Sequence, residues 1–194
     1  MDKKTAIKAR RAHIINAALA CFLEKGYNQT GIRDIARRAE ISLGNLYNHF
    51  PSKKAVLIEI ASMEEEEVEE LITLLADYRN PERTLRRFLK VFTKACEDPD
   101  YVMLFFEIIG EAIRDKEISD LFIASHEKLV DALAGLLFAG QKAGTFHEQT
   151  DPREVAEIIL DSLEGYGARA VLGMKTPRSG SKVLHDFLLK SILM

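Results

Sequence analysis

The chain has 194 residues, of which 47% are hydrophobic and 29% charged, a composition typical of a globular protein and not of a disordered one. Its uncharged apolar runs are far shorter than the roughly 18 residues that a membrane-spanning helix needs. The charged N-terminus does not lead into the apolar core of a signal peptide, so we expect a cytoplasmic protein that does not enter a membrane.

Positive charge is concentrated at the start of the chain, although the formal net charge is −3. Residues 1–54 hold eleven Lys and Arg and four Asp and Glu, a net charge of +7, whereas residues 55–194 carry −10. A basic head on an acidic body indicates that only the head meets the phosphates of a nucleic acid. We therefore predict two domains, residues 1–54 and residues 55–194.

Apolar residues recur at helical spacing and no strand-like alternation appears, so we predict an all-α fold of about nine helices. The first helix ends before Gly26, a residue typical of a helix end. Two short helices follow, for which Thr30 and Ser42 are the expected caps. The later helices are expected to begin near Ser52, Pro81, Pro99, Ile118, Pro152 and Lys182, with a loop from Lys175 to Ser181.

The stretch from Thr30 to Lys54 has the pattern of a helix-turn-helix, whose second helix enters the DNA major groove. Ile35 and Ala36 lie on the apolar side of the first short helix. In the second, Leu46 and Phe50 point inward and the residues between Leu43 and His49 otherwise point outward. Pro51 ends this helix.

Gly26-Tyr27, Thr30, Ile35-Ala36 and the run from Ala39 to Lys53 agree in order and spacing with a known pattern. They resemble the DNA-binding domain of the TetR (tetracycline-repressor-like) family, over roughly residues 8 to 60. The family usually has Gly in the turn where Glu40 stands here, and Glu tolerates a positive φ less well than Gly. The resemblance implies a three-helix DNA-binding domain followed by a helical domain for ligand binding and dimerisation.

The helix-turn-helix pattern and the resemblance together assign DNA contacts to nine residues. They are Thr30, Arg33, Ser42, Leu43, Gly44, Asn45, Tyr47, His49 and Lys53. By the resemblance, Thr30, Tyr47, His49 and Lys53 contact backbone phosphate. Base reading is expected at the start of the second short helix and at Arg33, because Asn can pair with adenine and Arg with guanine. The alternative for each single residue is ordinary exposed surface.

The resemblance also implies a small-molecule effector among the later helices. The predicted lining is Phe88, Phe92, Met103, Phe106, Glu107, Phe122, His126 and Tyr166. Ordinary core packing explains each aromatic residue equally well. The Glu107 carboxylate is flanked by apolar residues and must be paired, protonated or facing water. It is either a polar anchor for the ligand, which would then be cationic, or an edge residue.

The last two helices carry apolar residues that we expect to form a homodimer interface. They are Val155, Ile158, Ile159, Ser162, Leu163, Leu184, Phe187, Leu188 and Ile192. A two-fold symmetric dimer matches a palindromic DNA site. The alternative is that these residues only close the core of the monomer.

The sequence has no HExxH, P-loop, GxGxxG or GxSxG motif and no pair of His four residues apart, so we expect neither an enzyme nor a metal or cofactor. The leading hypothesis is a ligand-responsive transcriptional repressor. It would bind a pseudo-palindromic double-stranded DNA operator as a homodimer and be released by a small apolar or amphipathic ligand. The alternatives are a dimeric DNA-binding protein without ligand control and an all-helical enzyme.

Overall fold

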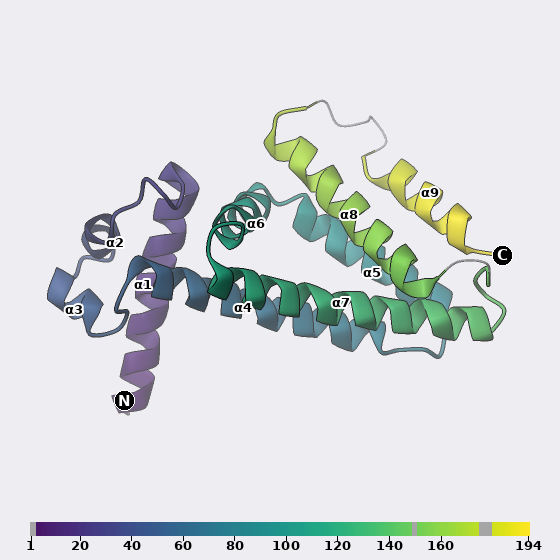
Figure 1. Cartoon of the computed structure of the whole chain (residues 1–194), viewed down its shortest axis with the longest axis horizontal. Helices are drawn as coiled ribbons and strands as arrows, with labels where there is room; N and C mark the ends of the chain where they lie inside the picture. Colours follow the sequence, from purple (N-terminus) through teal and green to yellow (C-terminus); the bar gives the residue numbers. More distant parts are fainter. Residues whose placement is uncertain (1–2, 149–150, 175–179) are drawn as a thin grey trace. The chain divides into compact units, whose positions relative to one another are not determined.

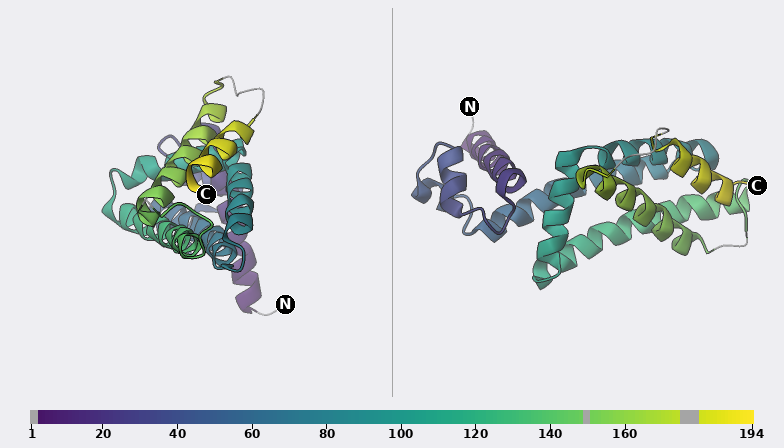
Figure 2. Two further views of the ribbon diagram at one scale, coloured as in Figure 1. Left: turned by 90° about the vertical axis from the view of Figure 1, so that its right-hand side faces the viewer. Right: turned by 90° about the horizontal axis from the view of Figure 1, so that it is seen from above.

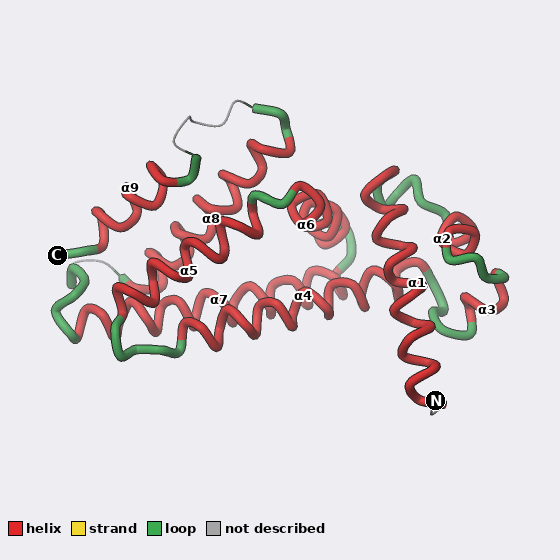
Figure 3. Tube along the Cα trace, turned by 180° about the vertical axis from the view of Figure 1, so that it is seen from behind, coloured by secondary structure: helices red, strands yellow, loops and turns green. Residues whose placement is uncertain are grey.

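A computed structural model of the protein describes residues 3–148, 151–174 and 180–194. In this part of the chain every regular element is a helix, apart from one isolated bridge between Phe146 and Leu193 (Figure 3). The helices are α1 (Lys3–Lys25), α2 (Ile32–Arg38), α3 (Leu43–Tyr47), α4 (Lys53–Leu75), α5 (Pro81–Cys96), α6 (Pro99–Ala112), α7 (Lys116–Lys142), α8 (Pro152–Val171) and α9 (Lys182–Ile192). The all-α prediction is confirmed, while most of the predicted loop from Lys175 to Ser181 lies outside the described residues.

The chain packs as two compact units. The first unit comprises Met1–Glu65 together with Met103–Phe122, and the second comprises Glu66–Val102 and Ile123–Met194. The predicted division at residue 54 falls inside the first unit, which keeps the three N-terminal helices together and extends along α4 to Glu65. Packing adds to them a later segment, Met103–Phe122, that the charge distribution along the sequence had no means of assigning.

The first unit is built around one apolar face of α1. Ile14, Ala18 and Phe22 follow one another at helical spacing and are completely buried. α2 packs against α1, and α3 packs against α2 (Figure 1). Because Ala36 on α2 is small and buried, the two helices can approach each other closely.

The second unit has its core where α5 packs against α8 and α9 (Figure 2). The apolar face of α5 is almost completely buried and includes Leu85, Phe88 and Phe92. A partly buried hydrogen bond lies beside it, where the Thr93 hydroxyl is 2.7 Å from His185 Nε2. Among the described helices none combines the length and apolar character that crossing a bilayer would require.

Helix α8 approaches the end of α5 closely at Gly167. A Cβ added to Gly167 would lie 2.7 Å from the backbone oxygen of Cys96, closer than a Cβ carbon comes to a non-bonded atom in real structures. A Cβ added to Gly165, two residues earlier, would meet no atom within 4 Å. Of these two glycines, only Gly167 is therefore required by the packing.

We predict opposite effects for alanine at these two positions. Gly167→Ala should lower the free energy of unfolding by about 1–3 kcal/mol, because the backbone of α5 must move. Gly165→Ala should raise it by up to about 1 kcal/mol through helix propensity alone. Urea denaturation followed by circular dichroism checks both values, and equal effects of the two substitutions would contradict the close approach at Gly167.

Candidate nucleic-acid interface

Helix α2 starts one residue later than predicted, because Gly31 and not Thr30 is its N-cap. The backbone amide of Gly31 donates to the Asp34 carboxylate at 3.0 Å. The Thr30 hydroxyl is directed at two carbonyl oxygens, Cys21 O at 3.1 Å and Gly26 O at 2.8 Å, and the residue is 1% exposed. Thr30 therefore offers no donor to a phosphate, and its predicted DNA contact is replaced by a packing role.

Helix α3 begins as predicted at its Ser42 cap. The Ser42 hydroxyl oxygen accepts the backbone N–H of Asn45 at 3.1 Å. Leu46 and Phe50 anchor this short helix in the core of the first unit. Glu40, in the turn between α2 and α3, has φ of 51°, the left-handed conformation that the family's usual Gly would adopt with less strain.

Two side chains of α1 hold the ends of the short helices. The Arg11 guanidinium donates to the carbonyl of His49 at 2.7 Å, lies over the Phe50 ring and pairs with Glu59 at 2.8 Å. His13 Nε2 lies 2.9 Å from the carbonyl oxygen of Ala39 and donates to it. Neither role follows from sequence spacing, because both partners are more than twenty residues away.

The remaining predicted DNA-binding residues keep accessible side chains or backbone. Arg33, Ser42, Gly44 and Tyr47 are exposed, with Tyr47 at 48%, while Leu43, Asn45 and His49 are half-buried. Lys53 serves the interior as well, because its ammonium donates to the carbonyl of Tyr27 at 2.6 Å. It also lies 4.0 Å from the centre of the Tyr27 ring, and burial lowers the pKa of Lys53.

The predicted ligand residues divide between the two units. Met103, Phe106, Glu107 and Phe122 belong to the first unit, and Phe88, Phe92, His126 and Tyr166 to the second. Phe88 and Phe92 stack with ring centroids 5.5 Å apart and are buried, so the structure gives these two rings a core position.

Glu107 is paired and does not stand as a free polar anchor. Its Oε2 accepts the backbone N–H of Tyr27 at 2.7 Å, within the first unit. Of the three alternatives for this carboxylate, which were pairing, protonation and exposure to water, the structure shows pairing. We therefore do not place the ligand anchor at Glu107, whose partner lies eighty positions away and is brought near only by the fold.

The second unit contains a carboxylate that the sequence analysis missed. Burial raises the pKa of Glu164 on α8 to about 7, and the charge of Asp161 adds to the effect. Its position four residues after the fully buried Leu160 placed it on the apolar stripe of α8, a signal that could have revealed it.

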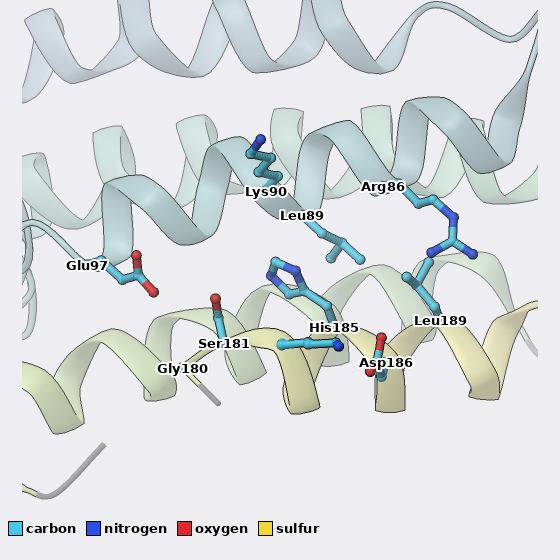
Figure 4. Close-up of a pocket in the computed structure, with 10 residues that line it drawn as sticks. Arg86, Leu89, Lys90, Glu97, Gly180, Ser181, His185, Asp186 and Leu189 are labelled. Atoms are coloured by element: carbon cyan, nitrogen blue, oxygen red, sulfur yellow. The ribbon is translucent and has the colours of Figure 1, made fainter. Parts of the chain in front are cut away.

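A groove of about 450 Å³ lies between α5 and α9 in the second unit (Figure 4). It is lined by Arg86, Leu89, Lys90, Glu97, Gly180, Ser181, Lys182, His185, Asp186 and Leu189. None of the predicted ligand residues lines it. Among the described residues, no three His, Cys, Asp or Glu side chains gather as they would around a metal ion.

The three N-terminal helices share one core, and the last of them, α3, is short, capped by Ser42 and lined with accessible polar residues. This arrangement defines a helix-turn-helix DNA-binding protein. Residues 14–60 match the bacterial regulatory proteins of the tetR family, and residues 81–192 match the C-terminal domain of the BetI-type transcriptional repressors. The protein therefore belongs to the tetR family and is a DNA-binding transcriptional regulator.

Relatives compared by sequence and by solved structure agree with this assignment. The chain is 32% identical to the transcriptional repressor KstR of Rhodococcus jostii (strain RHA1), over 80% of this chain and 70% of KstR. A putative transcriptional regulator from Saccharomonospora viridis, solved in complex with choline, has a TM-score of 0.82 at 22% identity and covers 96% of this chain and 99% of its own. The SmeT–triclosan complex has a TM-score of 0.79 at 25% identity, with 96% and 92% covered.

We predict that base-reading and phosphate-contacting residues respond differently to substitution. Arg33→Ala and Asn45→Ala should change which base is preferred at one position of the site, at about 1–3 kcal/mol. Tyr47→Phe removes only an exposed hydroxyl and should weaken binding to all sequences alike, by about 1 kcal/mol. Each protein variant is titrated against a DNA site selected from random sequences and against single-base changes of that site. Identical binding profiles for the three protein variants would contradict the distinction between base-reading and phosphate-contacting residues.

Proposed function

We propose that the protein is a transcriptional repressor that binds a pseudo-palindromic operator as a homodimer. A small apolar or amphipathic ligand releases it from DNA, and it acts in the cytoplasm without catalysing a reaction. The observation that carries the proposal is α3, in which the Ser42 hydroxyl already accepts the Asn45 N–H while Gly44 and Tyr47 remain exposed. Such a helix start can approach base edges in a major groove.

The ligand part of the proposal rests on the relatives and on the second unit. The relatives from Saccharomonospora viridis and SmeT were solved with choline and triclosan, two small molecules of different polarity. Glu164 gives the second unit a carboxylate that burial keeps partly protonated. An effector with a cationic group would favour its charged form, so we place the polar anchor of the effector at Glu164 instead of Glu107.

The homodimer part of the proposal rests on exposed apolar side chains of α8 and α9. Ile158 and Phe187 are 59% and 69% exposed, and Val183, one turn before Phe187, is 59% exposed. Large apolar side chains exposed together are typical of an interface. Four other predicted interface residues are buried within the second unit and seal its core instead: Ile159, Leu163, Leu188 and Ile192.

Selection from random DNA tests the function directly. We expect a two-fold symmetric consensus, and we expect a compound found by thermal-shift screening to lower the affinity for it. Glu164→Gln should reduce the response to a cationic compound and leave DNA binding without it unchanged. A dimer that binds DNA without sequence preference and responds to no compound would favour the alternative of a DNA-binding protein without ligand control.

We predict that the dimer depends on Phe187. Phe187→Glu should give a monomer at micromolar concentration in analytical ultracentrifugation, because a charge replaces the most exposed aromatic ring of α9. Val91→Glu is the matched control, since Val91 is also exposed, at 43%, but lies on α5. The control variant should sediment as a dimer, and a monomeric wild-type protein would refute the proposed interface.

A further inference from the structure

The turn between α1 and α2 passes through Tyr27 and is held tightly to α1. Gly26 ends α1 with φ of 79°, and its amide donates to the carbonyl of Phe22 at 2.7 Å. The Tyr27 ring packs edge-on against the Phe22 ring, with 5.2 Å between centroids. The Thr30 amide lies 3.2 Å from both the Gly26 and Tyr27 carbonyls, so the turn leads directly into the Gly31 cap of α2.

Side chains from two later helices bind the backbone of Tyr27 on either side. Glu107 of α6 accepts the Tyr27 N–H at 2.7 Å, and Lys53, the first residue of α4, donates to the Tyr27 carbonyl at 2.6 Å. The segment that leads into α2 and the segment that follows α3 are thereby both bound at Tyr27. We call this arrangement of Glu107, Tyr27 and Lys53 the Tyr27 tie.

The Glu107 side chain lies against the turn that it binds. A Cβ added to Gly26 would lie 3.1 Å from Oε1 of Glu107, so this carboxylate packs directly on the backbone of the turn. One helical turn further along α6, Glu111 accepts from the amide side chain of Asn28 at 2.9 Å, but that bond is exposed. A hydrogen bond shielded from water is stronger than an exposed one, so the partly buried Glu107 bond should contribute more than the Glu111 bond.

We propose that Glu107 is a positioning residue for DNA recognition. By holding the Tyr27 N–H, Glu107 fixes the turn that starts α2. Because Lys53 binds the carbonyl of the same residue, the fixed turn also holds the segment that follows α3. The reading helix is thus held in its orientation by a residue of α6 that itself touches no DNA. This role rests on the proposed DNA recognition and goes beyond it, because it names what orients the reading helix.

Substitutions at Glu107 and Glu111 test the proposal by DNA titration and amide hydrogen exchange. Glu107→Ala should weaken binding to the selected site about tenfold, equivalent to about 1.4 kcal/mol. It should also speed the exchange of the Tyr27 amide. Glu107→Gln retains an oxygen that accepts the same N–H, so it should remain within about twofold of the wild type and keep the amide protected.

Glu111→Ala is the matched control. It removes the same negative charge from the same helix, so it reports the electrostatic effect on DNA binding without loss of the tie. If Glu107→Ala binds DNA as tightly as Glu111→Ala, the proposal is wrong. Should the alanine variant not fold, Glu107→Asp replaces it, because the shorter side chain keeps the charge but cannot reach Tyr27 N. An aspartate variant with wild-type affinity and wild-type exchange would equally overturn the positioning role.

The outcome is separable from that of the function test. A wild-type protein that selects no DNA sequence would defeat the proposed function, whatever the variants do. A wild-type protein that selects a sequence, with Glu107→Ala indistinguishable from Glu111→Ala, would defeat only the positioning role.

Discussion

The first unit depends on how the backbone of Tyr27 is satisfied. A turn between two helices leaves N–H and C=O groups that helix geometry does not pair, and a partly buried group left unpaired costs free energy. Here a carboxylate of α6 takes the N–H and an ammonium of α4 takes the carbonyl. A single residue of the turn therefore links α1, α2, α4 and α6, and the orientation of α3 follows from that link together with its own burial of Leu46.

Charge in the first unit is balanced more locally than the net +7 of residues 1–54 suggests. Lys54 pairs with Asp115 at 2.7 Å and with Glu117 at 2.8 Å, both in the later segment that joins this unit. Arg38 pairs with Glu24 at 2.6 Å. Exposed pairs of this kind contribute little to stability, so DNA phosphates can compete for their cations. The positive charge that meets DNA therefore depends on these ion pairs as well as on the net charge of residues 1–54.

In the second unit, α8 and α9 contribute one face to the core and, in our proposal, the other face to the dimer interface. The buried faces of α8 and α9 close on α5, where Gly167 allows the backbones to approach and Cys96 is shielded, which raises the pKa of its thiol to about 12. Their outer faces keep Ile158 and Phe187 exposed. A thiol with so high a pKa is unreactive, so Cys96 is a buried structural thiol.

The sequence by itself determined the helices, the Ser42 cap and the family, because helical periodicity, caps and the spacing of the helix-turn-helix residues are local properties of the chain. It also located the strained turn at Glu40, since a positive φ is a local requirement. Only the tertiary structure decided which polar groups are used inside the protein. The burial of Thr30 depends on how the turn folds back onto Cys21 near the end of α1. The pairing of Glu107 with Tyr27 and the division of the α8 and α9 residues between core and surface depend on partners far along the chain. Such contacts arise from packing between helices, and no spacing within one helix encodes them.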